Sequence, residues 1–183
     1  MRPILPICAQ MCNEITKQQV LTERFVEFFK LENIDFNDID KFNDEYQMRL
    51  GDKYFFCNNG LETVTVLKGK YKQYAVTNGT FVAQSRKLNQ SGLIDIFDDV
   101  FISDKIGFEK PSIEFFDAVQ EKIGEFIKDE VIIIGDSLTS DIKGGNNAGI
   151  LCCWYNPLNL ENKTDLKVDY EIKDLNEILD IIK

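Results

Sequence analysis

The segment VIIIGDSLTSDIKGGNNAG, residues 131–149, begins with a run of β-branched residues and continues into a loop with two aspartates. An uninterrupted apolar run of this kind predicts a strand that is buried on both faces of a parallel sheet. Gly135 ends the run and lets the chain turn sharply. Asp136 follows directly, and Asp141 lies further along the same loop, at the predicted start of a helix. Both carboxylates therefore lie just beyond the carboxyl end of a strand, where open α/β sheets bind ligands.

Two acids on one loop can bind a hard cation. Mg²⁺ is usually held by one or two protein carboxylates together with phosphate and water, so Asp136 and Asp141 are candidate magnesium ligands. The alternative is that Asp136 is an ordinary turn residue and Asp141 a helix N-cap, which are both common roles. The strand, the turn and the paired acids together favour the metal interpretation.

The composition excludes several classes of function. The chain has 183 residues, 44% of them hydrophobic, and a net charge of −10, which argues against nucleic acid or an anionic membrane as a partner. It contains no histidine, which excludes Ser-His-Asp and Cys-His catalysis. Five cysteines without a CxxC pair indicate reduced thiols in a cytoplasmic protein. No apolar run approaches the length of a membrane span.

Helical and strand patterns alternate along the chain. Helices are predicted at residues 16–31, 37–50, 61–67, 81–89, 111–123, in a short segment from residue 141, and at 175–182. Strands are predicted at residues 73–77, 99–103, 131–134, 150–154 and 168–172. This order implies an α/β fold with a Rossmann-like, doubly wound parallel sheet. The aromatic residues of the first two helices are interpreted as core rather than as a cofactor site.

Two further loops end at the same edge of the predicted sheet. Thr77-Asn78-Gly79-Thr80 follows a strand, and its hydroxyl and backbone N–H groups can hold phosphate oxygens, helped by the N-terminus of the next helix. Lys110 precedes Pro111, which is expected in the first turn of a helix, and its ammonium can neutralise a bound phosphoryl group. Taken singly, Asn-Gly is an ordinary turn and Lys110 a surface lysine. Because both loops are expected at the same edge of the sheet as the aspartate loop, the three loops together favour a phosphate site.

In order and spacing, the three loops resemble the motifs of the haloacid dehalogenase (HAD) superfamily of phosphatases. The resemblance covers roughly residues 54–183. It matches Thr77 to the second motif, Lys110 to the third, and Asp136 with Asp141 to the metal-binding fourth. Within the superfamily, the loops are most similar to those of the noncanonical pyrimidine 5'-nucleotidases (YjjG-like).

The same resemblance implies a division of the chain and a missing part. Residues 53–183 would form the HAD-like core, and residues 1–52 a remnant of the helical cap. The first motif of the superfamily, Asp-x-Asp-x-Thr, has no counterpart, because no aspartate precedes Asp35. We therefore expect an N-terminally truncated chain without its nucleophile and without the middle strand, which would lie between residues 73–77 and 131–134.

A missing middle strand would leave two rows of backbone N–H and C=O groups without partners, at a cost of about 1–3 kcal/mol for each buried group. We expect the flanking strands to pair directly, or a homodimer to form. Filling of the gap by residues 4–9 is less favoured, because Pro6 lacks an N–H.

The resemblance implies Mg²⁺-dependent hydrolysis of a small phosphorylated substrate, with a nucleotide as one candidate, through an aspartyl-phosphate. The implied site consists of catalytic Lys110, phosphate-binding Thr77, Asn78, Gly79 and Lys110, and metal-binding Asp136 and Asp141. Without its nucleophile the chain alone is expected to be inactive. The alternatives are a non-catalytic phosphate- or metal-binding module and an inactive fragment. A phosphoacceptor receiver domain also uses acids, a threonine and a lysine, but its paired acids come early in the chain and here they come late.

Overall fold

The computed structural model describes residues 16–182 of the chain. The chain divides into two compact units, Met1–Leu50 and Gly51–Lys183. The identification of the first unit as a cap remnant, with a boundary at residues 52 and 53, stays a prediction. None of the helices between residues 16 and 182 is both long and apolar enough to cross a membrane.

The described residues before the second unit form α2 Lys17–Leu31 and α3 Ile39–Gly51, whose last residue is the first of the second unit. Thr16 begins α2 with a capping box, in which its hydroxyl accepts from the Gln19 N–H and the Gln19 side chain accepts from the Thr16 N–H. Asp38 accepts a hydrogen bond from the Lys41 N–H at 3.3 Å, as an N-cap residue does. The second helix therefore begins at Ile39 rather than at residue 37.

Aromatic rings hold α2 and α3 together. The Phe25 ring lies 4.9 Å from Phe42 and 5.0 Å from Tyr46, and Phe29 lies 5.1 Å from Phe42, all in edge-to-face geometry. Such pairs add to the energy gained by burying the rings. This packing agrees with the core interpretation for Phe29, which is buried, but not for Phe28, which is 51% exposed.

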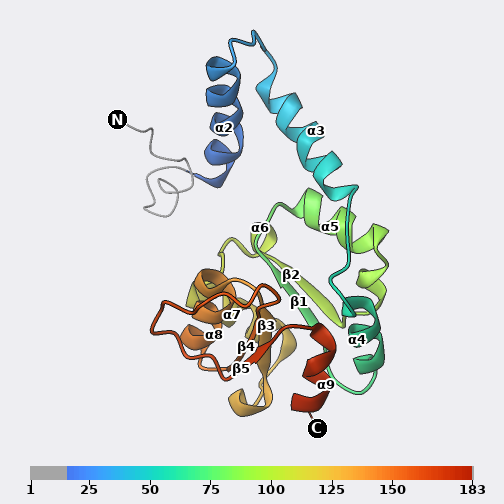
Figure 1. Ribbon diagram of the computed structural model, residues 1–183. Helices are drawn as coiled ribbons and strands as arrows, with labels where there is room; N and C mark the ends of the chain where they lie inside the picture. Colours follow the sequence, from blue (N-terminus) through green and yellow to red (C-terminus); the bar gives the residue numbers. More distant parts are fainter. Residues whose placement is uncertain (1–15, 183) are drawn as a thin grey trace. The chain divides into compact units, whose positions relative to one another are not determined.

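The described part of the second unit alternates strands and helices (Figure 1). Its strands are β1 Tyr74–Thr77, β2 Asp99–Ile102, β3 Ile132–Gly135, β4 Leu151–Tyr155 and β5 Tyr170–Ile172. Its helices are α4 Gly60–Leu67, α5 Phe81–Gln90, α6 Ser103–Ile106, α7 Ile113–Ile123, α8 Lys143–Ala148 and α9 Ile178–Ile181. The order is completed by 3-10 turns at Leu93–Asp95, Lys128–Glu130 and Leu175–Glu177, and by a π-helical turn at Leu138–Ile142.

Every strand pair in the described residues is parallel, which confirms the predicted α/β class. The strands form two sheets, β1–β2 and β3–β4–β5, instead of one. Within residues 16–182 no ladder joins β1 to β3, so the expected direct pairing of these strands is wrong. Phe116 of α7 packs against the apolar clusters of both sheets. Residues 4–9 lie outside the described residues, and a homodimer stays a prediction.

Helices cover both faces of the three-stranded sheet, as expected for a doubly wound fold. On one face Leu67 of α4 and Ile178 of α9 pack against Cys153, and on the other Phe116 packs against the cluster around Ile133. The predicted burial of β3 on both faces is met only at Ile133, since Ile132 and Gly135 are half-buried. Ile134, near the carboxyl end of β3, is 38% exposed.

Cysteines contribute to this core as reduced thiols. Cys152 and Cys153 on β4 are buried and unpaired, while Cys57 is exposed. Burial raises the pKa of the Cys153 thiol to about 12, so it stays protonated near neutral pH. These three cysteines therefore agree with the expected reduced state.

Candidate active site

Three loops converge where β1 and β3 end, as predicted from the parallel order of the strands. The Asn78 side chain after β1 donates to the Lys110 carbonyl at 2.8 Å. The Lys110 ammonium in turn donates to Asp141, on the turn after β3, at 2.6 Å. Loops from both sheets therefore meet at one edge.

Lys110 is the centre of this arrangement. Its side chain is only 7% exposed, and its ammonium donates to the Val76 carbonyl on β1 at 2.8 Å and to the Asp141 carboxylate. The ammonium thus bridges the two sheets at the place where no ladder joins them. The alternative interpretation of Lys110 as a surface lysine is wrong. These are its two bonds within residues 16–182, and since an ammonium has three donors, a third is available for a ligand.

Asp141 lies in the first turn of a helical segment, as predicted, but it is not the N-cap. Ser137 is the N-cap, because its hydroxyl accepts from the Ser140 N–H at 3.2 Å. The second carboxylate oxygen of Asp141 accepts from the Ser137 N–H at 3.1 Å. A Cβ at Gly135 would lie 2.3 Å from Asp141 Cγ. Glycine at the end of β3 is therefore required for the carboxylate to reach Lys110.

The Asp136 side chain lies in a different environment from that of Asp141. Its backbone carbonyl is fixed by the Trp154 indole, which donates at 3.0 Å, while its side chain is exposed. The oxygen-only pair of Asp136 and Asp141 fits a hard cation such as Mg²⁺, which takes its remaining ligands from water or phosphate. Among residues 16–182 no group of three or more acidic or cysteine side chains is close enough to hold a metal by itself.

The loop after β1 makes more hydrogen bonds to other parts of the protein than its sequence predicts. The Gly79 N–H donates to the Ser103 hydroxyl at 3.2 Å, and the Asn78 amide is bonded to the Lys110 backbone. Thr77 keeps its predicted place at the end of β1. The Gly79 N–H and the Asn78 side-chain amide are therefore already bonded within the protein.

The N-terminus of α5 already has an anionic group beside it. The Phe81 N–H donates to the Asp104 carboxylate at 2.9 Å, and the Thr80 hydroxyl accepts from the Ala83 N–H. Because these N–H groups are already bonded, the N-terminus of α5 can contribute less to phosphate binding than expected. Sequence reasoning missed Ser103 and Asp104, although their position directly after β2 places them at the same sheet edge.

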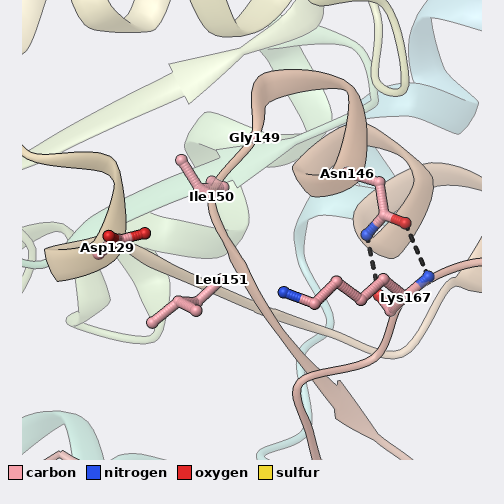
Figure 2. Close-up of a pocket in the computed structure, with 6 residues that line it drawn as sticks. All are labelled: Asp129, Asn146, Gly149, Ile150, Leu151 and Lys167. Carbon is pink, nitrogen blue, oxygen red and sulfur yellow. Dashed lines mark hydrogen bonds between the residues drawn. The ribbon is translucent and has the colours of Figure 1, made fainter.

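Two pockets of about 210 Å³ lie away from this convergence. One is at the amino ends of β3 and β4, where Asn146 and Lys167 are joined by two hydrogen bonds of 2.8 Å (Figure 2). Its lysine is paired with Asp169 at 2.6 Å, so the lining offers little free positive charge. The other is lined by residues of α5 and of the segment before α4, among them Tyr54 and Phe55.

Comparison with known proteins gives a family match over most of the chain. The family described as haloacid dehalogenase-like hydrolase matches residues 9–155. The pyrimidine 5'-nucleotidase PynA of Streptococcus pneumoniae is 42% identical over 118 residues, 64% of this chain and 50% of PynA. The pyrimidine 5'-nucleotidase YjjG of Escherichia coli is 33% identical over 115 residues, 63% of this chain and 51% of YjjG. The chain therefore spans about half the length of these two relatives.

A longer match extends to a solved structure. YfnB of Bacillus subtilis, named as a HAD-hydrolase, is 34% identical over 169 residues, 92% of this chain and 72% of YfnB. Its crystal structure, described as bound to magnesium, superposes with a TM-score of 0.86 over 97% of this chain and 78% of YfnB. The similarity thus extends to the whole described fold.

Proposed function

Because the chain belongs to the haloacid dehalogenase-like hydrolase family, we propose that it carries the phosphate- and metal-binding part of a Mg²⁺-dependent phosphatase site. The observation that carries the proposal is the buried Lys110 ammonium, 2.6 Å from Asp141 at the edge where three loops meet. A buried cation with one donor left can neutralise the charge of a phosphoryl group during its transfer.

Each group at this edge has a proposed role. The Thr77 hydroxyl and the loop through Asn78 and Gly79 orient phosphate oxygens, and Lys110 neutralises them. Asp136 and Asp141 hold Mg²⁺, which would supply further positive charge at the phosphoryl oxygens. Exposure of Asp136 and the oxygen-only donor set support this assignment.

The proposed substrate is a small phosphate monoester, with a pyrimidine nucleotide as the leading candidate. PynA and YjjG are both named as pyrimidine 5'-nucleotidases, and other relatives are named as glyceraldehyde 3-phosphate phosphatases. All of these substrates share a phosphate monoester, which is what the Lys110 edge would recognise. We also propose a cytoplasmic location, because the sequence has five cysteines without a CxxC pair.

The attacking carboxylate is proposed to be absent from this chain, since no aspartate precedes Asp35. This observation favours a second candidate function, a non-catalytic phosphate- and metal-binding module. The chain alone should hydrolyse p-nitrophenyl phosphate no faster than a blank, with or without Mg²⁺. Turnover that is abolished by Asp136→Ala would show instead that another group supplies the nucleophile.

The phosphate assignment is tested by substituting Lys110 and a matched lysine. Lys110→Ala should weaken vanadate binding by roughly 10–100-fold, because a hydrogen bond to a charged group is worth about 1.5–3 kcal/mol. Lys105 is the control, since its ammonium lies over the Phe81 ring at 4.3 Å and has no role at the convergence. Lys105→Ala should change the affinity less than about twofold. Equal effects of the two substitutions in titration calorimetry would remove Lys110 from the site.

The metal assignment is tested at Asp136. Asp136→Asn should weaken Mg²⁺ binding by roughly tenfold, because the number of carboxylate charges tunes affinity for hard cations. Asp117→Asn is the control, since Asp117 is exposed on α7. The affinities are measured by titration calorimetry. An Mg²⁺ affinity that is insensitive to Asp136→Asn contradicts the assignment.

A further inference from the structure

Asn78 makes a paired contact with one other residue. Its amide Nδ2 donates to the Lys110 carbonyl at 2.8 Å, and its Oδ1 accepts from the Lys110 N–H at 2.9 Å. One side chain thus satisfies both backbone groups of a residue 32 positions away, as a neighbouring strand would. A weaker contact of 3.4 Å reaches the Ser140 hydroxyl.

This contact requires an amide. An asparagine side chain offers a donor and an acceptor together, whereas an aspartate carboxylate accepts only. A hydroxyl has a single heavy atom for both roles and cannot bond the N–H and the carbonyl of Lys110 in this paired geometry. The amide is therefore committed to the Lys110 backbone, although Asn78 itself is exposed.

The contact controls where the ammonium lies. Lys110 reaches Val76 and Asp141 through a flexible side chain, so the positions of these bonds depend on a fixed Cα. We infer that Asn78 is a positioning residue, which sets the Lys110 ammonium at the phosphate edge through the Lys110 backbone instead of binding phosphate with its amide. The inference rests on the proposed function of Lys110 in phosphate binding.

The chain contains a matched control. Asn146 makes the same pair of bonds with the backbone of Lys167, at 2.8 Å each, at the amino ends of β3 and β4 (Figure 2). Asn146→Ala therefore removes the same chemistry from the same fold without touching Lys110. Comparison with this variant distinguishes a general loss of stability from an effect on the position of the Lys110 ammonium.

The first test measures the reactivity of Lys110 directly. Wild type, Asn78→Ala and Asn146→Ala are treated with trace acetic anhydride, and acetylation of each lysine is quantified by mass spectrometry. Lys110 should react about tenfold faster in Asn78→Ala and at the wild-type rate in Asn146→Ala. If Lys110 is acetylated at the wild-type rate in folded Asn78→Ala, the inference is overturned. If that variant does not fold, Asn78→Asp decides, since it keeps the acceptor and loses the donor, and should give faster acetylation than wild type.

The second test is a double-mutant cycle for vanadate binding with Asn78→Ala and Lys110→Ala. If Asn78 acts through Lys110, its substitution weakens binding about tenfold in the wild-type background and has no further effect in Lys110→Ala. Equal weakening in both backgrounds would mean that the amide contacts the anion, and overturns the inference. Vanadate affinity unchanged by Lys110→Ala would instead count against the proposed function, while the acetylation result still decides whether Asn78 positions Lys110.

Discussion

Asp141→Ala should lower the free energy of unfolding of the second unit by about 3–5 kcal/mol, the usual cost of leaving one member of a buried ion pair without its partner. The side chains of Lys110 and Asp141 are 7% and 11% exposed, so water cannot replace the lost carboxylate without rearrangement. The change is measured by urea unfolding with the fluorescence of Trp154, the only tryptophan of the chain, which is buried in this unit.

Two further variants make this result specific. Lys110→Met combined with Asp141→Ala removes the uncompensated charge and should recover more than half of the lost stability. Glu161→Gln breaks a pair with Lys163 whose side chains are 79% and 78% exposed, and should have no measurable effect. If Asp141→Ala is as mild as Glu161→Gln, the ammonium does not depend on this carboxylate.

The arrangement of the site could be predicted from the sequence because it follows from topology. Carboxyl ends of parallel strands lie at one edge, so Thr77 and Asp136, each at a strand end, were expected at the same edge of a doubly wound sheet. The proline-containing loop around Lys110 was expected at the same edge, and the structure brings it there. Helix and strand patterns also placed the five strands and the longer helices within a few residues, but not the short helix α6.

Hydrogen-bond partners could not be predicted, because they depend on distances between loops that are far apart in sequence. Nothing in the Asn-Gly dipeptide shows that the Asn78 amide bonds the Lys110 backbone. The expected first turn at Pro111 was wrong for a similar reason, since Ser112 caps α7 and the helix begins at Ile113. Propensity permits proline at a first turn, but the cap that forms decides the boundary.

The separation into two sheets could be predicted only in part. The resemblance located the break correctly between β1 and β3, but the expectation of direct pairing ignored the helix layer. Val76 and Phe116 both pack in the two apolar clusters that flank the break. Direct pairing of β1 and β3 would require those side chains to leave a packed core, and interiors packed at this density tolerate such changes poorly.

Gly135→Ala should also destabilise the second unit strongly, by about 3 kcal/mol, at the upper end of the cost of overpacking. The added Cβ would lie 2.3 Å from Asp141 Cγ and Oδ2 and 2.5 Å from Asp141 Cβ, so the carboxylate must move. Its bonds to the Lys110 ammonium and the Ser137 N–H would break with that movement. Urea unfolding followed by Trp154 fluorescence measures the loss.

A glycine with more room provides the control for this substitution. A Cβ at Gly60 would lie 3.2 Å from Leu175 Cδ1, the end of a flexible side chain, so Gly60→Ala should change stability by less than about 1 kcal/mol. Because Gly135→Ala acts through the Asp141 carboxylate, it should cost about 1 kcal/mol less in an Asp141→Ala background than in wild type. Strict additivity of the two substitutions would show that Gly135 is required for the backbone of the turn alone, and not for the approach of Asp141 to Lys110.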